Sequence, residues 1–159
     1  MRIAVDTNVL VRYLTWDDQG QAIEAARAIE AADAIVVPMI VLCELVWVLK
    51  RAYRYAGPEI IDILRRLAAM RAVEIERPAA EAGIAMLARG GDFADGIVRR
   101  EADGAKCERV VTFDQGFARH LRPDKVLLLR AGPRSDDPRR YGCRSRQART
   151  PGQGRFGAR

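Results

Sequence analysis

Histidine is nearly absent from this sequence: His120 is the only one among 159 residues. Hydrolysis by a Ser-His-Asp triad or by an HExxH zinc helix needs histidine at a defined place. The sequence contains neither pattern, and the GxxxxGKS/T segment of phosphate-binding loops is missing as well. If the chain is an enzyme, its chemistry has to be sought among other side chains.

Long apolar runs are also missing. No stretch approaches the ~20 residues that a membrane helix needs, and the short apolar run near the N-terminus ends in an acid, unlike a signal peptide. Cys43, Cys107 and Cys143 are odd in number, widely spaced and without CxxC pairing, which favours reduced thiols over disulfides or a zinc site. We therefore expect a cytoplasmic protein with no membrane segment.

Positive charge is concentrated at the C-terminal end. The formal net charge is +6, and residues 131–159 account for all of it with eight arginines and two aspartates. Residues 1–130 hold nineteen basic and nineteen acidic side chains. The end segment is also rich in Gly, Pro, Ser and Gln, so it cannot bury enough apolar surface to offset its ordering entropy. We predict a folded domain over residues 1–130 and a disordered basic tail over 131–159.

Short apolar strands alternate with helical patterns over residues 1–130. This order is typical of an α/β fold, and we predict a three-layer α/β/α domain with a short, mainly parallel sheet flanked by helices. The expected strands are 2–6, 34–37, 73–75, 109–112 and 126–129, and the expected helices are 21–32, 39–55, 59–70, 79–88 and 92–106.

Two acids follow predicted strands directly. Asp6 ends the first strand, and Asp114 comes two residues after the strand that ends at Thr112. Ligands of open parallel sheets bind beyond the carboxyl ends of the strands, so both acids are candidates for a site. Aspartate is also common as a turn residue or a helix cap. Each acid could therefore be a site residue or a structural one, and both interpretations remain open.

Glu44 lies among apolar residues of a predicted helix. Its neighbours one turn away are Ile40, Trp47 and Val48. This pattern predicts a buried carboxylate, and a buried charge is costly unless it is paired or bound to a metal. The alternative is a buried salt bridge with an arginine such as Arg12 or Arg51.

Asp95 stands at the beginning of another predicted helix. Asp92 is well placed as the N-cap residue, and Asp95 follows three residues later, as in a capping box. Metal binding at the start of the helix is the competing interpretation for Asp95.

Asp6, Glu44, Asp95 and Asp114 suggest more together than each does alone. Clustered carboxylates repel one another, so a fold tolerates several when a divalent cation neutralises them. Ligands that are all oxygen point to Mg²⁺ or Mn²⁺ rather than zinc. Such a site is suited to metal-assisted hydrolysis of a phosphodiester.

These residues resemble the motifs of the PIN-domain family, and within it the VapC-type toxins of bacterial toxin–antitoxin pairs. The resemblance covers residues 1 to about 130, and its specificity comes from the order and spacing of four short motifs. The motifs are AVDTNVL at 4–10, VLCELVWVL at 41–49, DFAD at 92–95, and VTFD at 111–114 followed by GFA at 116–118.

The resemblance implies an RNA endonuclease that uses Mg²⁺ or Mn²⁺. A water nucleophile would leave products with 5′-phosphate and 3′-hydroxyl ends. By the same resemblance, Asp6, Glu44 and Asp95 are the principal metal ligands or orient the water, and Asp114 supports a second or weaker metal position.

The resemblance also implies supporting residues and partners. Thr7 and Asn8 would hydrogen-bond to the first acid or to substrate, although Asn8 is equally well explained as a turn residue. Family members are usually homodimers neutralised by a small antitoxin, which lies in a groove beside the acids. The helices at 39–55 and 59–70 have apolar residues suited to such a groove, and core packing explains the same residues equally well.

The alternative is a module that binds RNA or an antitoxin with weak or no catalysis. Arginines could contact phosphates, and the basic tail could add nonspecific RNA affinity. Arginines on helices are more often a solvated face, however, and a pure binding module has no reason to keep four mutually repelling acids beside a polyanion. The arginines in question are Arg12, Arg51, Arg54, Arg99 and Arg100.

Overall fold

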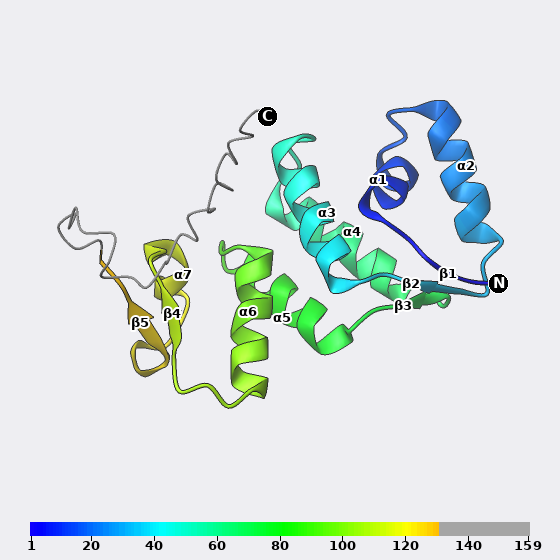
Figure 1. The fold of residues 1–159 in the computed structure, drawn as a ribbon. Coiled ribbons are helices and arrows are strands. Elements are labelled where there is room, and N and C mark those ends of the chain that lie inside the picture. The colour runs from blue at the N-terminus through cyan, green and yellow to red at the C-terminus, as the bar shows by residue number, and fades with distance from the viewer. Residues whose placement is uncertain (131–159) are drawn as a thin grey trace, which may run out of the picture. The chain divides into compact units, whose positions relative to one another are not determined.

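Five short strands and seven helices alternate along residues 1–130, the part of the chain that the computed structural model describes (Figure 1). The segment 131–159, for which a disordered basic tail is predicted, lies outside the described residues, together with Cys143. Cys43 and Cys107 are free thiols, as predicted. Within the described range, no helix is long and apolar enough to cross a membrane.

All strand pairs within residues 1–130 are parallel. β1 (Arg2–Ala4), β2 (Ala34–Val36) and β3 (Val73–Glu74) form one sheet in this order, with Ile3 opposite Ile35 and Ile35 opposite Val73. β4 (Val110–Thr112) pairs with β5 (Val126–Leu128) in a second sheet. Parallel neighbours need long crossover connections, and helices supply them here.

The helices account for most of the described chain. The α/β class, with short parallel strands and flanking helices, is confirmed, and the arrangement is consistent with a three-layer α/β/α fold. The helices are α1 (Thr7–Thr15), α2 (Gln19–Glu30), α3 (Met39–Arg51), α4 (Gly57–Ala69), α5 (Arg77–Ala88), α6 (Phe93–Gly104) and α7 (Gln115–Arg119), with a 3₁₀ turn η1 (Pro123–Lys125) before β5.

The main core collects one face of each helix from α1 to α6 against the first sheet. α4 shows the pattern clearly, because its buried residues are spaced at helical periodicity, as the sequence predicts. Its polar side chains point to solvent. The buried residues of α4 are Ile60, Ile61, Leu64 and Leu67.

A second, smaller core holds the C-terminal part of the described chain. Met86 of α5 packs with Phe117 of α7 and with Leu121, and Val110 and Val126 of the second sheet lie against them. β4 and β5 are therefore anchored through α7 to α5. The strands form two separate sheets within residues 1–130, where a single sheet was expected.

α5 and α6 approach each other very closely, side by side (Figure 1). A Cβ atom added to Gly96 would lie 2.4 Å from the carbonyl oxygen of Ala82, and one added to Gly83 would lie 2.5 Å from the ring of Phe93. Phe93 itself is only 1% exposed. The two glycines therefore allow the helix backbones to touch, and the ring of Phe93 fills the remaining space.

A polar cluster ties α1 to α2 and to the end of α3. Asp17 accepts hydrogen bonds from Arg12, from the Tyr53 hydroxyl at 2.5 Å and from Thr15 at 3.0 Å. Arg12 also donates to Gln21 of α2 at 2.8 Å. The Arg12 hydrogen bond, followed by that of Tyr53, holds the pKa of the Asp17 carboxyl well below its usual range.

Several element boundaries differ from the sequence-based expectation. α1 was not predicted, because its threonines, valines and tyrosine have low helix propensity; capping by Asp6 and burial of Leu10 and Val11 outweigh that preference. The helix predicted over 39–55 ends at Arg51, and Arg54 adopts a left-handed conformation with φ of 62°. The short helix α7 was also missed.

We expect Gly96→Ala to destabilise the protein by about 1–3 kcal/mol, since its new methyl group would push two helix backbones apart. Gly57→Ala is the matched control, because a Cβ atom there meets nothing within 4 Å; it should leave stability unchanged or raise it by a few tenths of a kcal/mol. Urea unfolding monitored by circular dichroism measures both. Equal stability of the two variants would contradict the proposed role of the α5–α6 contact.

Candidate active site

Asp6 lies where the sequence places it, two residues beyond the end of β1. It is the N-cap residue of α1, and its Oδ1 accepts a hydrogen bond from the backbone N–H of Val9 at 2.9 Å. The carboxylate is exposed. Capping, one of the two interpretations left open for this residue, is therefore present, and it uses one carboxylate oxygen.

Thr7 connects the beginning of α1 to the middle of α3. Its side chain is buried, and its hydroxyl donates to Oε2 of Glu44 at 2.7 Å. Thr7 thus bonds to the second acid in the structure, whereas the resemblance implied a bond to the first acid or to substrate. Asn8, the other predicted supporting residue, is exposed in the first turn of α1 and lines a shallow hollow between α1 and α2.

The prediction that Glu44 is buried is wrong: its side chain is exposed. α3 turns its opposite face to the core, and Ile40 and Trp47, on the same side as Glu44, are 73% and 62% exposed. The alternative of a buried salt bridge with Arg12 fails too, since Arg12 pairs with Asp17. Glu44 is therefore an accessible carboxylate, oriented by Thr7 and surrounded by exposed apolar side chains.

Asp92 and Asp95 occupy the beginning of α6. Asp92 is the N-cap residue, as predicted, and accepts from the backbone N–H of Ala94 at 3.0 Å. Asp95 lies in the first turn and is half-buried. Partial burial raises the pKa of the Asp95 carboxyl above its usual range, and the charges of Asp92 and Asp114 add to this effect.

Asp114 follows β4 and caps α7. Its Oδ1 accepts from the backbone N–H groups of Gly116 at 2.6 Å and Phe117 at 3.1 Å, while its own N–H donates to the Thr112 hydroxyl at 2.9 Å. The side chain is exposed. These bonds fix one carboxylate oxygen of Asp114, whose charge acts on Asp95.

His120, the single histidine of the sequence, also belongs to this neighbourhood. It is half-buried at the end of α7, and its charge lowers the pKa of Asp95, against the larger effect of burial. A Cβ atom on Gly91 would lie 3.2 Å from the His120 ring. No local pattern announces this position, because α7 reaches it only by packing on Met86.

The four predicted acids do not meet in one cluster of metal ligands in the described residues. Thr7, the residue after Asp6, donates a hydrogen bond to Glu44, and the charges of Asp92 and Asp114 act on Asp95. Asp6 and Asp114 follow strands of two different sheets. Within residues 1–130, no three His, Cys, Asp or Glu side chains lie close enough together to hold one metal ion.

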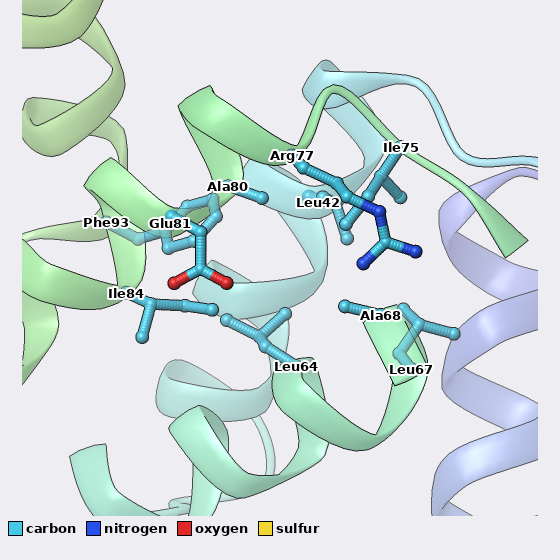
Figure 2. Close-up of a pocket in the computed structure, with 10 residues that line it drawn as sticks. All are labelled: Leu42, Leu64, Leu67, Ala68, Ile75, Arg77, Ala80, Glu81, Ile84 and Phe93. Carbon is cyan, nitrogen blue, oxygen red and sulfur yellow. The ribbon is translucent and has the colours of Figure 1, made fainter. Parts of the chain in front are cut away.

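An apolar hollow between α3, α4 and α5 is the least promising place for a substrate (Figure 2). Eight of its ten lining residues are apolar, with Arg77 and Glu81 as the exceptions. Its volume of about 10 Å³ admits one water molecule at most. We regard it as a small packing defect of the core.

The PIN-domain family model matches residues 3–121, which is most of the chain. The α/β fold, with acids after its strands and at the beginning of its helices, agrees with this match. The chain belongs to the PIN-domain family. PIN domains are generally nucleases and typically depend on divalent metal ions. A comparison with curated proteins gives no match.

The donor set agrees with a hard divalent cation. Each candidate ligand is a carboxylate, and Mg²⁺ is commonly held by one or two carboxylates together with water and substrate phosphates. Asp6, Glu44, Asp95 and Asp114 supply donors of this kind. The described residues therefore fit a magnesium ion or manganese ion that also needs substrate or water, and they do not form a closed cage of protein ligands.

We predict that Asp95→Asn raises stability near neutral pH. The raised pKa means that the folded state holds its proton more tightly, so wild-type stability falls as pH rises through the ordinary aspartate range towards the raised value. The gain from Asp95→Asn should therefore vanish in acid, where aspartate is protonated in both states. Urea unfolding curves measured at a series of pH values give this profile.

Asp17→Asn is the control of opposite sign. The lowered pKa of Asp17 means that its contribution is present above the ordinary aspartate range and is lost as pH falls through the lowered value. Asp17→Asn should thus destabilise near neutral pH. Two variants with the same sign of effect would contradict the electrostatic description of Asp95.

Proposed function

We propose that the chain is a metal-dependent endoribonuclease that hydrolyses RNA phosphodiester bonds. The observation that carries the proposal is the position of Asp95: a half-buried carboxylate with two further acids beside it, in a PIN domain. Such a carboxylate costs stability when it is charged, and a divalent cation would offset that cost.

Asp6, Glu44, Asp95 and Asp114 would hold Mg²⁺ or Mn²⁺. When bound, the ion activates water at neutral pH and stabilises charge on the leaving oxygen. The chain orients the acids through its backbone: N–H groups of α1 and α7 fix one oxygen of Asp6 and of Asp114, leaving the second oxygen for a ligand.

Thr7 is a positioning residue in this proposal. Its buried hydroxyl holds Glu44 in one orientation, while the carboxylate remains open to solvent. Changing a group that orients a metal ligand typically lowers metal affinity or activity about 10- to 100-fold.

The biological setting we propose is that of a toxin. The motifs around the four acids resemble those of VapC-type toxins, which supports a cytoplasmic homodimer neutralised by an antitoxin protein. The exposed apolar side chains on α3, Ile40 and Trp47, are compatible with a protein partner beside Glu44.

One observation favours the alternative of an RNA-binding or antitoxin-binding module with weak or no catalysis. Within residues 1–130, no three acids lie close enough together to hold one metal ion. A chain with this arrangement would bind RNA without cleaving it unless substrate and metal complete the site.

The decisive experiment incubates purified, antitoxin-free protein with a mixed pool of structured RNAs and Mg²⁺ or Mn²⁺. We expect cleavage that EDTA abolishes and that Asp6→Asn or Asp95→Asn reduces more than about 100-fold, since loss of a ligand should exceed the 10–100-fold cost of losing a ligand's supporting residue. Asp62→Asn is the matched control, an exposed acid of α4 paired with Arg66 at 2.8 Å, and it should retain full activity.

Cleavage that survives both EDTA and Asp6→Asn would overturn the metal–carboxylate mechanism. RNA binding without cleavage by the wild-type protein would favour the alternative function.

We further expect Thr7→Val to lower cleavage about 10- to 100-fold and to raise the Mg²⁺ concentration needed for half-maximal rate. The change removes a hydroxyl at nearly constant volume, and water can reach the exposed Glu44, so the urea midpoint should move little. Thr7→Ser keeps the hydroxyl and should restore most of the activity. Loss of stability in parallel with activity would instead indicate a purely structural role.

A further inference from the structure

Positive charge gathers around α6 just beyond Asp95. Two hollows lie against the second half of this helix, one of about 190 Å³ between α5 and α6 and one of about 150 Å³ between the end of α6, the chain leading into β4, and η1. Both are lined by Arg99 and Asp103, so they adjoin.

The lining of the two hollows is strongly basic for a domain of zero net charge. Six cations face two acids, Asp103 and Glu108, which leaves a local excess of four positive charges. We call this surface the basic groove. Its cations are Arg89, Arg99, Arg100, Arg109, Arg122 and Lys125.

Few of these charges are neutralised by neighbours. Arg99 approaches Asp103 only to 3.8 Å, and Arg122 pairs with Asp124 at 3.1 Å on the exposed surface. The other four cations form no ion pair with any acid of residues 1–130. A groove of this kind has guanidinium groups available for the bidentate hydrogen bonds that bind phosphate.

The basic groove begins beside the candidate active site. Gly96, the residue after Asp95, lines the first hollow. Arg99 stands four residues after Asp95, which places the two side chains on the same side of α6, about one helical turn apart. An anionic chain that passes Asp95 therefore meets the arginines next.

We infer that the basic groove binds the phosphate backbone of the RNA on one side of the scissile bond. This inference rests on the proposed nuclease function for its substrate, and charge complementarity supports it. The basic tail of the same chain is excluded as the occupant, because residues 131–159 carry a net charge of +6. The groove then positions the strand, while the acids perform the chemistry.

The test compares two pairs of adjacent arginines. Arg99→Gln with Arg100→Gln alters the basic groove, and Arg65→Gln with Arg66→Gln makes the same charge change on the exposed face of α4. Both pairs are made in full-length protein that also carries Asp6→Asn, so that RNA is not cleaved. Binding of a fluorescent single-stranded RNA of mixed sequence is measured by anisotropy over a range of salt concentrations.

The groove pair should weaken binding at least about tenfold, because a hydrogen bond to a charged group is worth roughly 1.5 kcal/mol or more. The slope of log K against log salt should become shallower by about 0.7 for each RNA phosphate that the variant no longer neutralises. The α4 pair should change neither quantity comparably. In protein without Asp6→Asn, the groove pair should raise KM and leave kcat nearly unchanged.

Equal RNA binding by the two pairs of variants would overturn the inference that the basic groove binds RNA, even if the wild-type protein cleaves RNA. The wild-type protein could bind RNA without cleaving it, with binding weakened only in the groove pair. This outcome would support the groove and contradict the nuclease function. Selective loss of binding to poly-glutamate, with RNA binding intact, would assign the groove to an acidic protein partner and so overturn the inference. Arg109→Gln with Arg122→Gln, in the second hollow, repeats the test if the first pair lowers the urea midpoint.

Discussion

The contact between α5 and α6 is the constraint on which the candidate site depends. Gly83 and Gly96 let the two backbones touch, and Phe93 closes the gap at the beginning of α6. Through this contact the first turn of α6 is held rigidly against the core, and Asp92 and Asp95 are held with it. The first hollow, between α5 and α6, and the arginines further along α6 take their positions from the same contact. A shift or tilt of α6 at this contact would move its carboxylates and its arginines together.

Charge changes sign along α6, from acids at its beginning to arginines in its middle. Carboxylates stand at its beginning, where the positive end of the helix dipole moderates their mutual repulsion. Arginines follow in the middle, next to the two hollows. The domain as a whole has no net charge, so attraction of a polyanion must come from this local separation, with residues 131–159 adding a sequence-encoded excess of positive charge.

The sequence predicted the α/β class, the main strands and the apolar face of α4, because these follow from local periodicity. It did not predict the exposure of Glu44. α3 is apolar around most of its circumference, so periodicity cannot identify the buried face, and tertiary packing left Ile40 and Trp47 outside. The place of His120 was out of reach for a similar reason, since only the packing of α7 on Met86 brings it near Asp95. The separation of β4 and β5 from the first sheet depends on strand pairing over long sequence distances.

Helix capping gives some of the acids a purpose unrelated to chemistry. Asp6 and Asp114 satisfy backbone N–H groups that would otherwise lack partners, so a descendant that had lost all enzymatic activity would still be selected to keep them for folding. Glu44 and Asp95 cap no helix. In a related chain, the presence of aspartates at the positions of Asp6 and Asp114 would therefore reveal little about activity. The presence or loss of the acids at the positions of Glu44 and Asp95 would distinguish an active nuclease from an inactive one.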